Sequence, residues 1–369
     1  MITSHFINLA KSTIHSLSPY QPGKPIEEIQ REFGVEHIIK LGSNENPLGA
    51  SAHIPAAIAK VTTTTAIYPN GSSYYLLHKL AEYLQVSYEQ VMLGSGSDEI
   101  LSLLIQAFTM PGQEVMVSQY GFAMYSIFAK AHGAQVITVP AQEWGCDLMA
   151  MLDAITPNTK LIFIANPNNP TGTWISHDAL QQFLHDIPRH VLVVIDEAYY
   201  EYMQAEKLYP NSLALQKHHD NLVITRTFSK IYGLASLRVG YAIAHPEIVN
   251  ILNRIRLPFN VNAAASAAAM AALDDQTHVA KSYELNQAGR TQLLTAFKQL
   301  QLDVIGNAGN FITVKIGTPA MSIYQNLLKS GIIVRSLLPY NMNEYLRITI
   351  GLPDQNQSVI DNLAQLLKA

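Results

Sequence analysis

Lys230 lies just after an apolar run, in a setting that suits covalent chemistry on an aldehyde. It follows the run 222–224, has Thr227 and Ser229 before it, and has Arg238 eight positions further on. A lysine amine forms a Schiff base with an aldehyde, and hydroxyl and guanidinium groups can hold a phosphate. These residue types predict a site for an aldehyde cofactor that carries a phosphate. The alternative is a solvated lysine after a strand, so other motifs have to support the prediction.

Two more polar groups stand where apolar runs end. The run 161–165 is followed by the Asn-Pro-Asn-Asn-Pro-Thr-Gly sequence that contains Asn169, and the run 191–195 is followed by Asp196 and, three residues on, Tyr199. At about 3 Å and an effective dielectric constant near 20, a carboxylate attracts a protonated ring nitrogen by on the order of 5 kcal/mol. Asp196 therefore suits a cofactor with a basic ring. A helix cap and a structural turn are the alternatives for Asp196 and Asn169.

A glycine-rich turn in the stretch 91–99 has the form of an anion site. A short apolar run leads into Gly96, Ser97 and Asp98, and a helix is predicted to begin there. Amides at a helix start and the positive end of its dipole favour an anion, although Ser97 or Asp98 could also simply cap the helix. The turn is not a dinucleotide fingerprint, because Glu99 stands where the third glycine belongs.

The elements that must position these residues alternate along the chain. Strand, loop and helix patterns recur about every 25 to 35 residues from 91 to 244, which predicts a largely parallel sheet with helices on both faces. Ligands bind at the carboxyl ends of such strands, where the polar residues lie. After Pro258 a long helical stretch, about 261–300, precedes short strands and helices. We predict an arm and short helix over 1–45 that join the small lobe, a large domain over 46–257, and a small C-terminal domain over 258–369.

Composition limits the function classes. A chain of 369 residues with 48% hydrophobic and 14% charged residues can bury large cores in two lobes. A net charge of -4 argues against nucleic acid as a partner, and no apolar run is long enough for a transmembrane helix, so no membrane partner is expected. The single cysteine and the absence of a signal peptide predict the cytoplasm. Thirteen histidines show no metal-binding spacing, so no metal is expected.

The pattern Ser-Lys-x-x-x-Leu-Ala-x-Leu-Arg-x-Gly, from Ser229 to Gly240, resembles the class I and II aminotransferases of pyridoxal phosphate (PLP) fold type I. The resemblance extends from 17–20 to 346–349. It implies an α/β fold, in which a large domain with a mostly parallel mixed sheet flanked by helices joins a smaller α+β C-terminal lobe, and it implies a homodimer with a composite active site.

Within that family the chain is most similar to enzymes of histidine biosynthesis. The resemblance implies a small-molecule amino donor, histidinol phosphate, and a 2-oxo acid, 2-oxoglutarate. An aromatic amino-acid aminotransferase, a phosphothreonine decarboxylase of the same fold and a non-catalytic PLP-binding protein remain alternatives.

The resemblance also implies roles for individual residues. Lys230 would bind PLP and act as general acid and base. The other residues expected at the cofactor are Gly96, Ser97, Asp98, Tyr120, Asn169, Asp196, Tyr199, Ser229, Arg238 and, from the neighbouring subunit, Tyr68. The residues expected at the substrate are Tyr20, Asn46, Tyr68, Asn169, Arg335 and Arg347. Two arginines suit a phosphate, which is nearly doubly charged at neutral pH.

Overall fold

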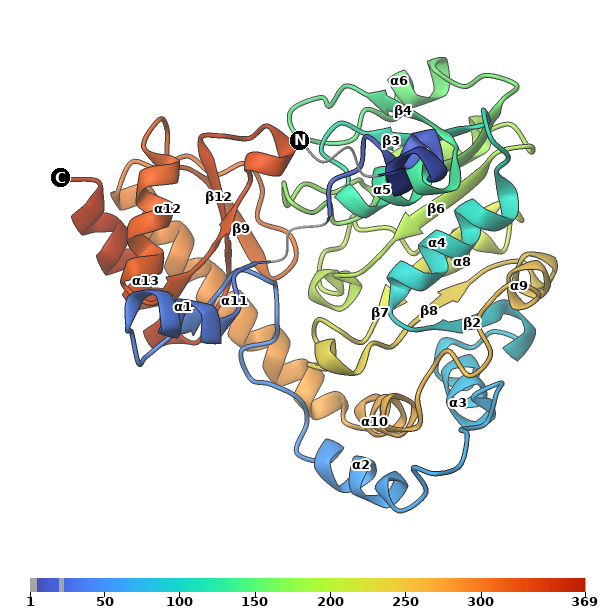
Figure 1. The fold of residues 1–369 in the computed structure, drawn as a ribbon, viewed down its shortest axis with the longest axis horizontal. Coiled ribbons are helices and arrows are strands. Elements are labelled where there is room, and N and C mark those ends of the chain that lie inside the picture. The colour runs from blue at the N-terminus through green and yellow to red at the C-terminus, as the bar shows by residue number, and fades with distance from the viewer. Residues whose placement is uncertain (1–4, 20–22, 369) are drawn as a thin grey trace.

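A seven-stranded sheet forms the large part of the molecule (Figure 1). The structure is a computed structural model that describes residues 5–19 and 23–368. Along the sheet the order is β2 (Val91–Gly94), β8 (Gly240–Ile243), β7 (Leu222–Thr227), β6 (Leu192–Asp196), β5 (Thr159–Ala165), β3 (Glu114–Ser118) and β4 (Gln135–Val139). The neighbours from β7 to β4 pair in parallel, whereas β8 runs antiparallel to both β7 and β2. The predicted, largely parallel sheet is confirmed.

The central strands are apolar throughout because both faces of the sheet are covered. Along β5, Ile162 and Ile164 belong to one buried cluster, and Leu161 and Phe163 belong to another on the opposite face. Neighbouring side chains on a strand point to opposite faces, so a continuous apolar run is what a sheet between two helical layers requires. The helices of this part are α3 (Tyr74–Leu84), α4 (Ser97–Phe108), α5 (Ala123–His132), α6 (Leu148–Asp153), α7 (His177–Asp186), α8 (Ser212–Gln216) and α9 (Pro246–Asn253).

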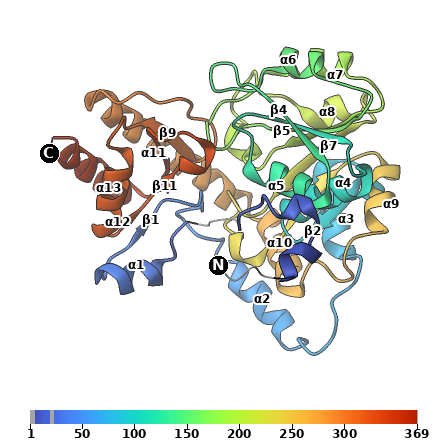
Figure 2. The ribbon, with the colours of Figure 1, turned by 45° about the horizontal axis from the view of Figure 1, so that its top comes forward.

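The small lobe contains two short sheets built from both ends of the chain. The strand β12 (Tyr345–Thr349) lies between β11 (Arg335–Ser336) and β9 (Phe311–Lys315), antiparallel to both. The second sheet pairs β1 (Ile39–Lys40) in parallel with β10 (Ile332–Ile333). Figures 1 and 2 place α1 (Ile26–Phe33) beside α12 (Ala320–Lys329), and α13 (Pro353–Leu366) covers the same lobe.

The helical stretch predicted over about 261–300 is two helices. The first, α10 (Ala263–Asp274), packs against α2 (Ile54–Thr62) and contributes alanines to the core of the large part. The second, α11 (Gln276–Gln299), extends into the small lobe (Figure 1). Asp275 separates them and caps α11 by accepting a hydrogen bond from the amide of His278 at 3.0 Å. The domain boundaries given above stay a prediction.

Short 3-10 helices complete the list of elements: η1 (His5–Leu9), η2 (Ser12–Ile14), η3 (Tyr88–Gln90), η4 (Tyr200–Met203), η5 (Ala235–Leu237) and η6 (Leu338–Tyr340). Among the helices of the described residues, none is both long and apolar enough to cross a membrane.

Candidate active site

A pocket of about 130 Å³ lies at the carboxyl ends of β5, β6 and β7. The carboxyl edge of a parallel sheet is where the loops after neighbouring strands converge. Eight of the residues predicted for the site line this pocket: Ser97, Asp98, Asn169, Asp196, Tyr199, Ser229, Lys230 and Arg238. Residues that are far apart in the sequence are thus brought together around one cavity.

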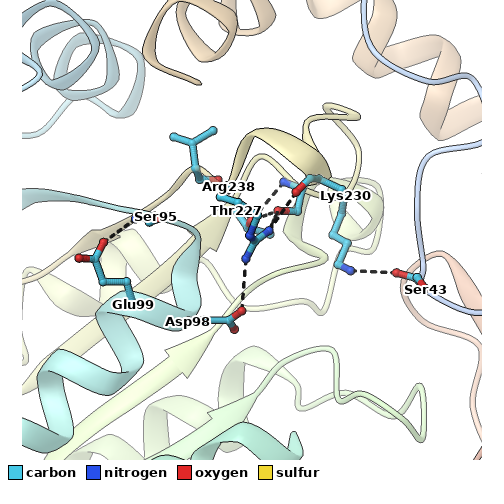
Figure 3. Close-up of polar contacts among 10 residues, drawn as sticks. Ser43, Ser95, Asp98, Glu99, Thr227, Lys230 and Arg238 are labelled. Carbon is cyan, nitrogen blue, oxygen red and sulfur yellow. Dashed lines mark hydrogen bonds and ion pairs between the residues drawn. The ribbon is translucent and has the colours of Figure 1, made fainter. Parts of the chain in front are cut away.

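Lys230 extends from the loop after β7 toward residues 42–44. Its Nζ donates a hydrogen bond to the carbonyl of Ser43 at 3.3 Å (Figure 3). The same Nζ lies 5.7 Å from the centroid of the Tyr199 ring. Burial, followed by the positive charge of Arg347, lowers the pKa of Lys230 to about 8. A lysine with this pKa has far more neutral, nucleophilic amine at pH 7 to 8 than an exposed lysine has.

A second part of the pocket lining contains groups that can bind an anion. Arg238 donates from Nη1 to the hydroxyl of Ser229 at 3.2 Å and from Nη2 to Asp98 at 3.3 Å, and Thr227 donates to Ser229 at 3.0 Å (Figure 3). Gly96 precedes α4 with φ of 77°, and a Cβ built there would lie 2.5 Å from Nη2 of Arg238. Gly96 therefore makes room for the guanidinium beside the start of α4.

Asp196 is held by two hydroxyl groups at the end of β6. Tyr125, from α5, donates to Oδ2 at 2.8 Å, and Thr225, from β7, donates to Oδ1 at 3.1 Å. Burial raises the pKa of Asp196 to about 6, and the two hydrogen bonds act in the opposite direction. A cationic partner in the pocket would therefore favour the ionised form of this carboxyl group.

The small lobe reaches the pocket through Arg347 on β12. Its Nη1 donates to Oδ1 of Asn169, and its Nη2 donates to the carbonyl of Gly42 at 2.7 Å. Arg335 lies directly opposite Arg347 in the antiparallel pairing of β11 with β12, and directly opposed residues leave a sheet on the same face. The two arginines are therefore direct neighbours across β11 and β12.

The family Aminotransferase class I and II matches residues 36–365 of the chain. The chain belongs to the class I and II aminotransferase family. Relatives match it over nearly its whole length. The histidinol-phosphate aminotransferase 2 of Pseudomonas fluorescens strain Pf0-1 is 48% identical, over 99% of each chain. The histidinol-phosphate aminotransferase of Moorella thermoacetica is 47% identical, over 97% of this chain and 92% of that protein.

Solved structures confirm the predicted fold. The histidinol-phosphate aminotransferase of Sinorhizobium meliloti, in complex with pyridoxal-5'-phosphate, is 28% identical and has a TM-score of 0.86, covering 97% of this chain and 96% of that one. Aspartate aminotransferase of Thermus thermophilus with maleate has a TM-score of 0.83 at 19% identity, covering 96% of this chain and 99% of that one. The second similarity bears on the fold alone.

In this aminotransferase Asn46 and Tyr68, both predicted to contact the substrate, are not part of the pocket lining. Asn46 is buried, and its Nδ2 donates to the carbonyl of Ile231 at 2.7 Å and to the hydroxyl of Ser282 at 2.8 Å. Its amide therefore anchors the loop after Lys230 to α11. Tyr68 is 78% exposed and stacks on Phe259, with 4.6 Å between ring centroids. Tyr20 lies outside the described residues.

Sequence reasoning chose Tyr120 as the aromatic ring beside the cofactor, but the aromatic residue of this turn that lines the pocket is Phe122. The ring of Tyr120 packs on Trp144 at 5.0 Å between centroids. Phe122 also meets Tyr125 edge-on, at 5.6 Å. We therefore propose Phe122 as the ring that stacks on a bound cofactor, in place of Tyr120.

The sequence reasoning also missed Tyr125 and Thr225, the two donors to Asp196. Thr225 could have been found from strand pairing, because it lies directly opposite Asp196 in the parallel register of β6 and β7. No sequence pattern pointed to Tyr125, because its contact with Asp196 depends on how α5 is rotated against the sheet.

Proposed function

We propose that this aminotransferase uses PLP to transfer the amino group of histidinol phosphate to 2-oxoglutarate. The observation that carries the proposal is a single pocket that is lined by one lysine, a buried carboxylate and a set of anion-binding groups, here called the anion cradle. The relatives that share 46 to 48% of its sequence over nearly the full length are named histidinol-phosphate aminotransferases, and this supports the choice of substrate.

The residues of the pocket fit PLP by their chemistry. Arg238, the hydroxyls of Thr227 and Ser229, and the amides at the start of α4 suit a phosphate dianion. Asp196 suits a protonated ring nitrogen, and Asn169 and Tyr199 suit the phenolic oxygen. PLP, when bound, supplies an aldehyde and an electron-accepting ring.

Within this arrangement each residue has a defined task. Lys230 would hold the aldehyde of PLP through its neutral Nζ, and as a free amine the same Nζ would take up and return the proton at the substrate carbon. Arg347 and Arg335 bind the substrate's phosphate or, for the second substrate, carboxylates. The cytoplasmic location stays a prediction.

A panel of amino donors tests the proposal directly. Purified protein with PLP and 2-oxoglutarate should form glutamate fastest with histidinol phosphate, and more slowly with phenylalanine. Phosphothreonine should release no carbon dioxide. A higher kcat/KM with phenylalanine, or decarboxylation of phosphothreonine, would instead support the aromatic aminotransferase or the decarboxylase.

We further propose that the active enzyme is a homodimer in which Tyr68 completes the phosphate site of the neighbouring subunit. Tyr68 lies in an exposed apolar patch with Ile67, Leu257 and Phe259. Apolar side chains exposed together on a protein surface commonly mark an interface. The Tyr68 hydroxyl would add one donor to the anion cradle across that interface.

Mixing two inactive variants should restore activity if the site is shared. A Lys230→Ala chain paired with a Tyr68→Ala chain has one intact site per mixed dimer, so about a quarter of wild-type activity is expected after random exchange. Size-exclusion chromatography with differently tagged chains verifies the exchange. Mixed dimers without any recovery would contradict the shared site.

Arg335 is expected to select phosphorylated donors. Charge-assisted hydrogen bonds contribute about 1.5 to 3 kcal/mol, so Arg335→Gln should lower kcat/KM for histidinol phosphate roughly tenfold or more relative to phenylalanine. Arg347→Gln serves as the comparison and should impair both donors. Equal losses for the two donors in Arg335→Gln would refute a selective role.

The rate at which PLP-free protein captures PLP is expected to rise with pH through about 8. The pKa of Lys230 is lowered to that value from 10.5, and only the neutral amine attacks an aldehyde. Below the pKa, the rate should fall about tenfold per pH unit. Stopped-flow absorbance measures the profile. Arg347→Gln removes a positive charge and should move the midpoint to higher pH, whereas a wild-type midpoint near 10.5 would contradict the burial of this amine.

A further inference from the structure

Residues 42–44, here called the crossing segment, touch three groups of the site in succession. The carbonyl of Gly42 accepts a hydrogen bond from Arg347, and the carbonyl of Ser43 accepts one from Lys230 (Figure 3). The side chain of Asn44 donates from Nδ2 to the phenolic oxygen of Tyr199 at 2.9 Å. The first two contacts use the main chain, so Asn44 is the residue of the crossing segment whose side chain specifies a contact with the site.

Asn44 is held rigidly in the orientation that this contact needs. It is 1% exposed, and its φ of 57° lies in the left-handed region, which asparagine tolerates better than most residues. Its backbone amide donates to Oγ1 of Thr349 at 3.0 Å, and the Thr349 hydroxyl donates back to Oδ1 of Asn44 at 3.1 Å. The side chain of Asn310 donates to the carbonyl of Asn44 at 2.9 Å.

The contact with Thr349 determines which end of the amide faces Tyr199. The Thr349 hydroxyl already accepts the backbone N–H of Asn44, so its own hydrogen needs an acceptor, and Oδ1 is that acceptor. Turning the amide around would take this acceptor away. The NH₂ group therefore faces Tyr199, and the phenolic oxygen of Tyr199 receives a hydrogen bond instead of giving one to Asn44.

The hydroxyl hydrogen of Tyr199 therefore remains available for a hydrogen bond to a group inside the pocket. The ring lies edge-on to Phe311 at 5.3 Å between centroids, and a Cβ at Gly309 would lie 3.3 Å from it, so the ring itself has little room to move. With one lone pair of its oxygen used by Asn44, the hydroxyl can direct its hydrogen toward an acceptor inside the pocket.

We propose that Asn44 is a positioning residue that makes Tyr199 a hydrogen-bond donor to the phenolic oxygen of the cofactor. This inference rests on the proposed function, in which PLP occupies the pocket. Asn44 also connects the site to the small lobe, because Thr349 and Arg347 are two residues apart on β12 and so lie on the same face of that strand. The strand that carries the substrate-binding arginine thus also orients the donor at the cofactor.

The test reverses the direction of this hydrogen bond. In Asn44→Asp the new carboxylate accepts from Tyr199, which removes the donor from the pocket, whereas Asn44→Gly keeps the left-handed backbone and deletes the amide. The measured quantity is the pKa of the Lys230–cofactor nitrogen, read from the visible absorbance of PLP-loaded protein as pH is varied. A donor on the phenolic oxygen competes with this nitrogen for that oxygen, so losing the donor raises this pKa.

We expect a rise of about one pKa unit in Asn44→Asp, close to that in Tyr199→Phe and larger than that in Asn44→Gly. In the Tyr199→Phe background, the charge-neutral change Asn44→Gly should add nothing, because Asn44 acts through Tyr199. Ser282→Ala is the matched control, since it removes a buried hydrogen bond that anchors the same loop through Asn46 and should lower thermal stability without moving the pKa.

The outcomes separate this inference from the proposed function. If wild-type protein gives no visible absorbance with PLP, the proposed function itself fails. If wild type binds PLP and neither Asn44→Asp nor Asn44→Gly shifts the pKa, the role of Asn44 is refuted. If Asn44→Gly shifts the pKa equally in protein that has Tyr199 and in Tyr199→Phe protein, the role is also refuted, since Asn44 would then act independently of Tyr199. Thermal unfolding of each PLP-free variant identifies any that fail to fold. If Asn44→Asp does not fold, the pKa shift in Asn44→Gly is the test.

Discussion

Replacing Lys230 by alanine is expected to abolish transamination while leaving the pocket able to bind PLP. In the proposed mechanism the Nζ of Lys230 is both the nucleophile toward the aldehyde and the group that moves the proton at the substrate carbon, so no other group of the pocket replaces it. Loss of a positioned general acid and base alone lowers a rate by up to about 10⁴-fold. Single-turnover measurements with histidinol phosphate should show a loss at least that large.

The binding half of this prediction depends on different residues. Arg238, Ser229 and the start of α4 are not altered by the substitution, so Lys230→Ala should still bind PLP without a covalent bond, as equilibrium dialysis would show. Lys60→Ala, an exposed lysine on α2, is the control and should behave like wild type. Borohydride treatment of PLP-loaded wild type should attach the label to Lys230, and a label on another lysine, seen by mass spectrometry, would contradict the assignment.

The second large effect is expected for Asp196→Asn. This change removes the negative charge that would keep the cofactor's ring nitrogen protonated, and the new amide must present an N–H toward the hydroxyl of Tyr125 or Thr225, both of which donate to the native carboxylate. A Coulomb energy on the order of 5 kcal/mol corresponds to a loss in kcat of about three orders of magnitude or more.

Steady-state kinetics at saturating PLP measure the effect of Asp196→Asn apart from weaker cofactor binding. Asp186→Asn, at the end of α7 on the surface, is the control and should keep wild-type activity. An Asp196→Asn enzyme within tenfold of wild type would show that the buried carboxylate does not set the charge of the ring.

The centre of the site could be predicted because its residues directly follow apolar runs. Lys230 and Asn169 follow β7 and β5, Asp196 is the last residue of β6, and the carboxyl ends of parallel strands converge on one edge of the sheet. The fold class could be predicted for the same reason, since long apolar runs separated by helical patterns leave few arrangements other than a doubly covered sheet.

The residues that were not predicted depend on turns and on short elements. Asn44 and Asn46 stand two positions apart in a loop without a repeating pattern, and the left-handed backbone at Asn44 decides which of them reaches Tyr199. The choice between Tyr120 and Phe122 likewise depends on the conformation of the turn before α5. The strands β1 and β10 have two residues each, which is too short for any periodicity to appear.

The pairing of β1 with β10 also affects the order in which the protein can fold during its synthesis. Ile39 is made early, but its partner, Ile332, is added when most of the chain already exists. The strands of the large sheet lie between 91 and 243, so that core can assemble while β1 still has no partner. Closing a loop of this length delays the pairing. We therefore expect the small lobe to fold last, and the crossing segment to reach its place over Lys230 only when the chain is almost finished.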